Sequence, residues 1–338
     1  DEAATNAGWG SEPDPRAGVF IGLGLDLNTT NYHLRWDARR RAEEWAGEGV
    51  DGQDLAAWTE GLAEAAGPAL SADRTMGALG GIVASRVSRE LRAGGPSFTV
   101  QGEEASGLRA LELAVRSLRS GEIDRAVVGA GDFAGDLRAM LARHALRPYS
   151  AGQTARPFDV EADGCVPGEG AAGVVLKRLK DAVEAGDVIY AVVRGVGSAG
   201  GGGVLETPTP EAYAEAARRA FADAGVKAGT VSLVEAHSGG DPDEDRAEAE
   251  GLSMLGLRAA VTSVKADVGH AGAASSLAGL VKAACCLYQE ILPPLRGHRS
   301  SRAELSPALE AQATPRYWLR DRAEGPRRAL VAAMGVDG

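Results

Sequence analysis

Cysteine is scarce in this sequence: its 338 residues include only Cys165, Cys285 and Cys286. Three cysteines cannot form a disulfide framework, and none of them lies in a CxxC pair. A disulfide-stabilised secreted fold is therefore excluded, and a reducing, cytoplasmic environment is the expected location. Aromatic residues are also few, at 5% of the chain.

Long apolar runs and an excess of basic residues are missing as well. No stretch of eighteen apolar residues occurs, and the first ten residues are mostly polar, with two acidic side chains at the start, so we expect neither a membrane-spanning helix nor a signal peptide. The 36 Lys and Arg against 47 Asp and Glu give a net charge of -11, which argues against a nucleic-acid-binding protein. The remaining composition, 44% hydrophobic and 25% charged, is that of a globular protein and excludes collagen, coiled coil and bulk disorder.

Short apolar runs alternate along the chain with segments in which apolar residues recur at helical spacing. This alternation predicts strands and helices in turn. Residues 1–16 are polar, with Pro13 and Pro15, and are expected to be a linker or a trimmed edge. We expect strands at 17–25, 97–100, 126–130, 173–176, 188–193, 233–236 and 259–264, and helices within 34–70, 75–92, 108–119, 211–224, 243–256 and 273–290.

One strand–turn–helix unit is especially well defined. A strand at 97–100 leads through a turn at 101–107 into a helix whose residues Leu108, Leu111 and Val115 form one apolar face. The same order of elements returns after residue 230, which suggests two similar halves packed together.

Three groups of motifs occur in a fixed order between residues 156 and 274. They are Arg156-Pro-Phe-Asp159 with Ala162-Asp-Gly164, Gly168-Glu-Gly-Ala-Ala172 and Val174-Val-Leu-Lys177; Val234-Glu-Ala-His237 with Gly239-Gly-Asp-Pro242; and Ser263-Val-Lys265 with Gly269-His270 and Ala273-Ala274. In order and spacing this set resembles the signature of β-ketoacyl synthases.

The resemblance implies the α/β thiolase fold, with two similar βαβαβ halves in a five-layered α-β-α-β-α sandwich, usually dimeric. The halves would be residues 17–178, lacking an N-terminal segment, and residues 179–338, truncated at the end. The segments 25–36 and 317–320 are also similar to synthases of polyunsaturated-fatty-acid and iterative polyketide multienzymes.

The nucleophilic cysteine of this family is absent here. The family pattern Thr-Val-Asp-Thr-Ala-Cys-Ser-Ser-Ser-Leu corresponds to Thr99-Val-Gln-Gly-Glu-Glu-Ala-Ser-Gly-Leu108, which puts Glu104 at the cysteine position. A cysteine at a helix N-terminus is activated because the helix dipole favours the thiolate. A carboxylate is a poor nucleophile toward a thioester, so we expect no acyl-enzyme and no condensation by this chain alone.

The resemblance carries over further residues and their roles. It implies that His237 and His270 stabilise the enolate and oxyanion, with Lys265 organising the electrostatics. Gly239, Gly335 and Val336 would belong to the pocket for the substrate, an acyl group on the phosphopantetheine of an acyl carrier protein, and no other cofactor is expected. Asp163 and Glu169 would fix the signature loop.

Three functions remain open at this stage. The first is a chain-length-factor-like subunit that does not condense and shapes the acyl tunnel of a cysteine-bearing ketosynthase, in a heterodimer or with itself. The second is a malonyl-carrier-protein decarboxylase that uses His237 and His270. A neutral Glu104 would favour it and an ionised one would oppose it, because a negative charge repels the malonyl carboxylate. The third is an active condensing enzyme whose nucleophile is one of the three cysteines. A metal site is not expected, because Asp241, Asp243 and Asp245 lack the other ligands of a calcium loop.

Overall fold

The computed structural model describes residues 2–24, 27–46, 51–133, 137–201, 208–320 and 322–335. The chain divides into two compact units. Unit 1 comprises residues 1–24 and 84–338, and unit 2 comprises residues 25–83. No described helix has both the length and the apolar character that crossing a bilayer requires.

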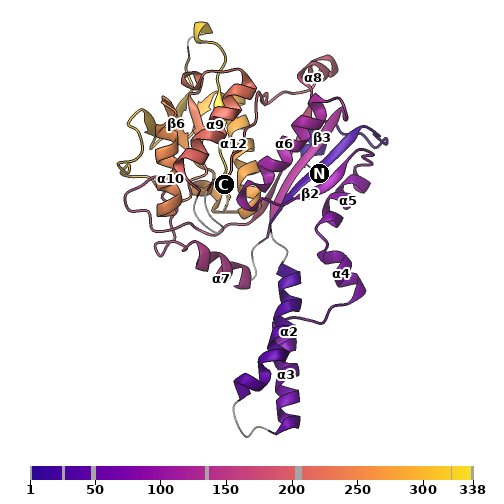
Figure 1. Ribbon diagram of the computed structural model, residues 1–338. Helices are drawn as coiled ribbons and strands as arrows, with labels where there is room; N and C mark the ends of the chain where they lie inside the picture. Colours follow the sequence, from indigo (N-terminus) through magenta and orange to yellow (C-terminus); the bar gives the residue numbers. More distant parts are fainter. Residues whose placement is uncertain are drawn as a thin grey trace. The chain divides into compact units, whose positions relative to one another are not determined.

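Unit 2 is helical, as expected for residues 34–70. Its helices are α2 (Leu27–Ala46), α3 (Gly52–Ala66) and α4 (Ala72–Ala78). Helices α2 and α3 lie side by side (Figure 1), and Arg35 of α2 is buried between them. Its guanidinium donates to the carbonyl oxygens of Ala63 and Gly67 and pairs with Glu64 at 2.8 Å. This satisfies the buried charge and ties the hairpin together.

The described residues of unit 1 form two four-stranded sheets, the first of them in the N-terminal half of the chain. Its strand order is β2-β1-β3-β4, where β2 and β3 run parallel to the central β1 and β4 runs antiparallel to β3. The strands are β1 (Ala17–Leu23), β2 (Ser97–Val100), β3 (Arg125–Asp132) and β4 (Gly170–Lys177).

The second sheet is formed by the C-terminal half, in the order β10-β5-β6-β8 with all neighbours parallel. Its strands are β5 (Leu233–Glu235), β6 (Ala259–Thr262), β8 (Leu309–Ala311) and β10 (Ala329–Val331). A separate antiparallel pair joins β7 (Ile291–Leu292) to β9 (Arg316–Tyr317). The two main sheets correspond, because in each the first strand of the half lies between the second strand and a later parallel one.

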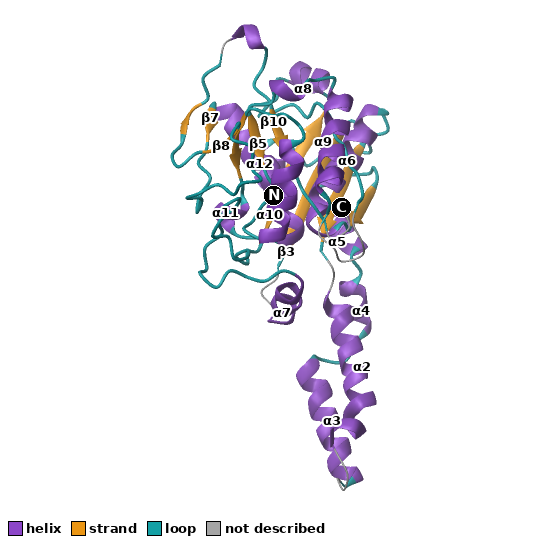
Figure 2. Cartoon of the chain, turned by 60° about the vertical axis from the view of Figure 1, so that its left-hand side comes forward, coloured by secondary structure: helices purple, strands orange, loops and turns teal. Residues whose placement is uncertain are grey.

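Helices cover both faces of each sheet. Between the sheets lie α6 (Ser106–Arg119) and α12 (Ser275–Gln289), which contact one another (Figures 1 and 2). Phe20 and Val128 of the first sheet pack with Leu277 of α12 in one buried cluster. The opposite face of that sheet packs against α5 (Gly81–Glu90), through residues from Ala84 onward.

The outer face of the second sheet is covered by α9 (Pro210–Ala224) and α10 (Pro242–Ser253). Val234 and Val261 point to this face and pack with Tyr213 and Leu252, whereas Leu233 packs on the α12 side. Alternate strand residues therefore serve alternate layers. The resulting α-β-α-β-α arrangement confirms the predicted fold class.

One expectation about secondary structure is wrong, because residues 188–193 form no strand among the described residues, although their sequence has strand character. In the segment expected to be a linker or a trimmed edge, residues 2–16 contain α1 (Glu2–Asn6). Trp9 of this segment packs against the first sheet, donates to the carbonyl of Leu91 and lies under the guanidinium of Arg125. The remaining described helices are α7 (Leu137–Leu146), α8 (Leu179–Ala185) and α11 (Lys265–Val268), with one-turn helices η1 (Glu103–Ala105), η2 (Ala228–Thr230), η3 (Gly272–Ala274) and η4 (Arg322–Glu324).

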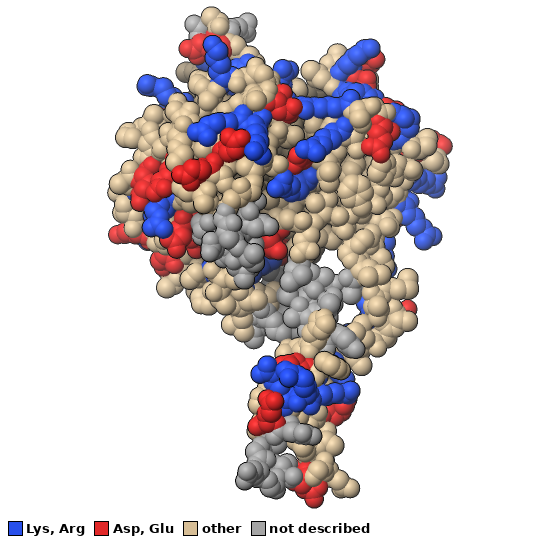
Figure 3. Space-filling view, viewed as in Figure 1, with Lys and Arg blue, Asp and Glu red and all other residues tan. Residues whose placement is uncertain are grey.

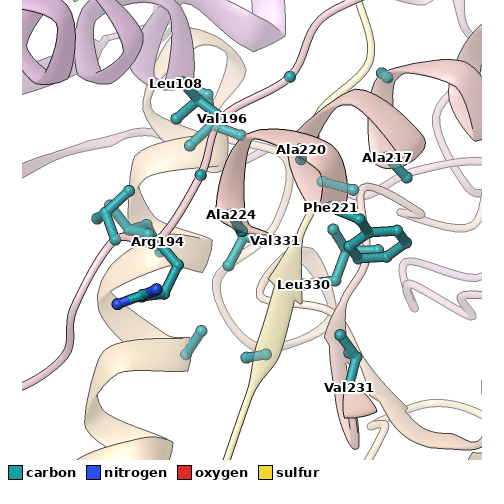
Figure 4. Close-up of a pocket in the computed structure, with 18 of the residues that line it drawn as sticks. Leu108, Arg194, Val196, Ala217, Ala220, Phe221, Ala224, Val231, Leu330 and Val331 are labelled. Carbon is teal, nitrogen blue, oxygen red and sulfur yellow. The ribbon is translucent and has the colours of Figure 1, made fainter. Parts of the chain in front are cut away.

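The missing strand leaves one edge of the second sheet open. In the first sheet β3 has antiparallel β4 on its outer side, whereas the corresponding edge of β10 has no strand partner in the described ranges. A largely apolar cavity of about 780 Å³ follows this edge, lined by Val196 on one side and Leu330 on the other (Figure 4). The cavity is thus a consequence of sheet architecture in the second half.

Candidate active site

Glu104 lies in a tight turn at the N-terminus of α6. The chain leaves β2, forms η1 and continues directly into α6. Glu103 has a φ of 47°, in the left-handed region that non-glycine residues rarely adopt. Ser106 stabilises the turn, because its hydroxyl donates to the carbonyl of Glu103 at 2.6 Å and accepts from the N–H of Gly102 at 3.0 Å.

His270 and Lys265 come from the matching turn of the second half. After β6 the chain forms α11, which begins at Lys265, and then η3, which leads into α12. His237 follows β5, the strand beside β6. Gly107 lets the beginnings of α6 and α12 approach closely, since a Cβ at this position would lie 2.8 Å from Ser276 Oγ of α12. The turns after β2 in the first sheet and after β5 and β6 in the second thereby bring Glu104, His237, His270 and Lys265 together.

The carboxylate of Glu104 pairs with a guanidinium that no sequence motif indicates. Arg147, in the segment after α7, holds Glu104 Oε1 in an ion pair, and both side chains are 14% exposed. The same oxygen lies 3.8 Å from His270 Nε2. Glu104 Oε2 is buried and has no hydrogen-bond partner among the described groups. The ion pair matches the ionised form of Glu104.

Arg147 also contacts a second buried carboxylate. Its Nε lies 2.5 Å from Oε1 of Glu244, which is 2% exposed, and Oε2 of Glu244 faces His237 Nε2 at 3.4 Å. Burial alone would raise the pKa of Glu244, but the hydrogen bond from His237 and the charges of Arg147 and Lys265 hold that pKa well below its usual range. Glu244 is therefore a fixed negative charge inside the site.

Both imidazoles direct the same nitrogen into the site. The N–H of Met334 donates to His237 Nδ1 at 3.1 Å, and the N–H of Gly272 donates to His270 Nδ1 at 3.2 Å. An Nδ1 that accepts leaves the proton of a neutral ring on Nε2. Burial, followed by the charge of Lys265, holds the pKa of His270 well below its usual value, so this ring is a neutral donor.

Lys265 lies beside the His237 ring, with Nζ 3.0 Å from Nε2 and 3.2 Å from Nδ1. Burial lowers the pKa of this lysine, while the nearby charges of Glu244 and Glu104 oppose the shift. A small cavity of about 10 Å³ lies next to His237 and Lys265, roughly the space of one water. Side chains of the protein thus fill the described part of the site.

Two further carboxylates hold the His237 turn and were also missed. Glu248 accepts from the N–H groups of His237 and Ser238 at 2.9 and 2.7 Å. Asp245 accepts from the N–H of Phe158 at 2.7 Å, and burial raises its pKa to about 7, against the hydrogen bond from Ser238. The acidic run in 241–250 could have indicated these residues. Glu244, Asp245 and Glu248 recur at a spacing that places them on one face of a helix, and that face is buried.

The other predicted residues lie at different distances from this centre. Gly239 is in van der Waals range of Lys265, because a Cβ there would lie 3.0 Å from the lysine Cδ. Gly335 is buried, whereas Val336 lies outside the described residues. Asp163 accepts from the N–H groups of residues 151 and 152 at 3.1 and 3.3 Å, and Glu169 is exposed just before β4.

None of the cysteines lies at a helix N-terminus. Cys165 is buried close to Gly239, and burial raises the pKa of its thiol to about 11. The same cause raises the pKa of Cys286 to about 11, and Cys285 is exposed on α12. A thiol with a raised pKa is mostly protonated at neutral pH and therefore a weak nucleophile.

Charges elsewhere are mixed. Lys and Arg alternate with Asp and Glu over the visible face of unit 1 (Figure 3). Within the described ranges no three His, Cys, Asp or Glu side chains are grouped so that they could hold a metal ion.

Comparison with known proteins identifies the family of the chain. The profile of the β-ketoacyl synthase N-terminal domain matches residues 1–182, and that of the C-terminal domain matches residues 190–298. The chain belongs to the β-ketoacyl synthase family. Polyketide synthases are among its curated relatives: it is 37% identical over 267 residues to the phthioceranic/hydroxyphthioceranic acid synthase of Mycobacterium tuberculosis, a match that covers 76% of this chain and 12% of the relative.

A second relative and two solved structures extend this comparison. The mycocerosic acid synthase-like polyketide synthase of M. tuberculosis is 36% identical over 264 residues, covering 75% of this chain and 12% of that protein, so the chain spans a small part of both relatives. The ketosynthase from module 6 of the bacillaene synthase of Bacillus subtilis 168 superposes with a TM-score of 0.78 and 25% identity, over 98% of this chain and 54% of that one. The ishigamide ketosynthase/chain length factor has a TM-score of 0.73 and 24% identity, over 90% and 70% of the two chains, which shows a shared fold.

Proposed function

We propose that this ketosynthase domain is a non-condensing, chain-length-factor-like component of a polyketide or polyunsaturated-fatty-acid synthase. The observation that carries the proposal is the ion pair of Glu104 with Arg147 at the N-terminus of α6. The helix dipole and the guanidinium both stabilise a carboxylate at this position. A carboxylate held in this way does not attack a thioester.

In this proposal the domain pairs with a cysteine-bearing ketosynthase and shapes the tunnel for an acyl chain on the phosphopantetheine of a carrier protein. The test is co-expression with the cysteine-bearing ketosynthases of the same pathway, followed by size-exclusion chromatography with mass detection. A stable heterodimer, with no acylation of this chain by an acyl-carrier-protein thioester, is the expected result. A strictly monomeric or self-only assembly at micromolar concentration contradicts the proposal.

A second candidate is decarboxylation of malonyl-carrier protein to acetyl-carrier protein. It is favoured by His237 and His270, which both direct an Nε2 proton into the site, as oxyanion stabilisation requires. It is opposed by the negative charges of Glu104 and Glu244. Incubation with malonyl-carrier protein and mass spectrometry of the carrier decides this: no turnover above a His237→Ala control excludes the activity.

The third candidate, condensation from a cysteine elsewhere, has less support. The two buried thiols have raised pKa values. The exposed Cys285 lies within α12, far from the N-terminus of that helix. Labelling with a cysteine-directed acyl-carrier crosslinker tests this candidate. Specific loss of activity on modification of one thiol would support condensation from that cysteine.

A further inference from the structure

The apolar cavity at the edge of β10 is a different space from the site of the two histidines. The described residues that line it include neither His237 nor His270. Its volume of about 780 Å³ lies within the range of about 300–1,000 Å³ that small-molecule sites occupy in proteins. Most of its wall is apolar and comes from α6, α9, α12 and β10, as Leu108, Phe221 and Leu330 show in Figure 4. Such a wall suits a hydrocarbon chain, because burial of the chain removes apolar surface from water.

The charged residues of this lining are nearly all basic. In the described part of the chain they are the single acid Glu112 and the arginines Arg109, Arg194, Arg320, Arg327 and Arg328. Glu112 already pairs with Arg109 at 3.4 Å, and Arg327 pairs with Glu290 at 2.7 Å. The other three arginines form no ion pair with a described residue, and Nε of Arg320 is buried without a hydrogen-bond partner there. The cavity therefore presents positive charge that lacks an internal counter-charge.

Two of these three arginines lie where the strands of the second sheet begin. Arg328 directly precedes β10, and its carbonyl oxygen accepts from the N–H of Ser232 at 3.1 Å, one residue before β5. Trp318, two residues before Arg320, donates its indole N–H to the hydroxyl of the same Ser232 at 3.2 Å. Arg320 and Arg328 are therefore anchored at the same end of the sheet.

Arg194 reaches this end along α9. The next residue, Gly195, lies against the last turn of α9, since a Cβ there would be 2.5 Å from the backbone nitrogen of Ala224. The chain passes from Ala224 through η2 to the start of β5. Arg194 is exposed, so the cavity reaches solvent at this end. In the other direction β10 leads to Met334, whose N–H binds His237, so the basic end is the one remote from the histidines.

We propose that this cavity binds a free fatty acid, with the hydrocarbon chain along β10 and the carboxylate among Arg194, Arg320 and Arg328 at the solvent end. The planar guanidinium fork donates parallel hydrogen bonds to a carboxylate, and it stays protonated at any physiological pH. The ligand is held without a covalent bond, and its carboxylate lies away from His237 and His270. The site therefore goes beyond the proposed function and does not depend on it.

The experiment measures binding of laurate to the whole chain by isothermal titration calorimetry at pH 7.5, below the micelle concentration of the ligand. The protein is first freed of copurified lipid on a hydrophobic resin. Dodecyltrimethylammonium is the matched ligand, because it has a chain of the same length and a positive headgroup. We expect laurate to bind at micromolar concentration and the cation to bind at least about tenfold more weakly, since only the carboxylate gains charged hydrogen bonds.

A first variant fills the cavity. Val196 lines the cavity opposite Leu330, so V196W places a large ring in the space of the hydrocarbon chain and should abolish laurate binding. V183W is the matched control, because Val183 is an exposed residue of α8 outside the lining, and it should bind laurate as the wild type does.

A second variant removes the positive charge. R194M/R320M/R328M keeps the length of the side chains and should bind laurate at least about tenfold more weakly, with no remaining preference over the cation. R86M/R218M/R299M is the matched control, because it changes three exposed arginines of unit 1 that do not line the cavity.

Circular dichroism and thermal unfolding establish that each variant is folded. The inference is overturned if the lipid-free wild type does not bind laurate, or if it binds the cation equally well. Laurate binding of wild-type strength by folded V196W or by the folded triple arginine variant overturns it too. If neither variant folds, the two ligands decide on the wild type.

The outcome is separate from the test of the proposed function. Failure to form a heterodimer with a ketosynthase removes the partner role and leaves laurate binding unaffected. Failure of the wild type to bind laurate removes the fatty-acid site and leaves heterodimer formation unaffected.

Discussion

In the first half the chain runs from β2 through η1 into α6, and in the second half it runs from β6 through α11 and η3 into α12. Both routes end a parallel strand with one tight helical turn at the same site. The first turn presents an anion, Glu104, and the second presents a neutral donor, His270. The same backbone arrangement therefore positions different chemistry in the two halves.

The two halves also differ in how the turns are held. A hydroxyl, that of Ser106, bridges the first turn, whereas a buried carboxylate, that of Glu248, accepts two N–H groups beside His237 in the second half. A hydroxyl can be lost at a modest cost, but a buried carboxylate that satisfies two donors cannot. We therefore expect the turn beside His237 to contribute more to stability than the turn before α6.

The largest effect is expected where the two halves share one core. Leu277 of α12 is fully buried against Phe20 and Val128 of the first sheet, and Leu252 of α10 is fully buried in the second half. Leu277→Ala and Leu252→Ala should each lower the free energy of unfolding by about 2–5 kcal/mol. Urea denaturation followed by circular dichroism should give one transition for unit 1 that shifts in both variants. A shift confined to one of two separate transitions would mean that the halves fold independently.

The second effect concerns the carboxylate that holds the His237 turn. Glu248→Ala leaves two buried N–H groups without an acceptor, so we expect a loss of about 1–3 kcal/mol for each group. Chemical denaturation measures the loss. Glu250→Ala on the same helix is the control, since Glu250 is only half-buried. Equal losses in the two variants would show that the contacts of Glu248 add nothing to stability.

A smaller effect is expected at the turn of the first half. Ser106→Ala removes one hydroxyl that bridges Gly102 and Glu103, and the expected loss is about 1 kcal/mol. Thermal unfolding of this variant beside Ser117→Ala, a change at an exposed end of α6, measures it. If Ser106→Ala costs more than Glu248→Ala, the turn before α6 contributes more to stability and the comparison is reversed.

The sequence predicted the elements that build the site but not the contacts that close it. Residues of each strand–turn–helix unit are neighbours in the chain, so local pattern and motif spacing located Glu104, Lys265, His237 and His270. Arg147 and Glu244 lie outside this pattern. Their ion pairs join residues far apart in the sequence, and a single chain carries no local signal for such a contact. The expected strand at 188–193 had the right pattern, yet a strand also requires pairing with a strand distant in the sequence, and these residues pair with no strand in the described chain, although the edge of β10 is open.

The last effect depends on pH and concerns a buried carboxyl group of the second half. Burial raises the pKa of Glu235, on β5, to about 7, against the charge of Lys282. A raised pKa means that the folded state binds the proton more tightly than the unfolded state, where the group titrates near its ordinary value of 4.5. The stabilisation from this group is therefore complete below about pH 4.5 and is lost as the pH rises through about 7. Glu235→Gln cannot titrate, so the free energy of unfolding of the wild type minus that of the variant should increase as the pH falls from 8 to 5. Other buried groups, including His270, are present in both proteins and cancel in this difference. Guanidinium denaturation at several pH values measures it, and a difference independent of pH would show that Glu235 does not bind its proton more tightly in the folded second half.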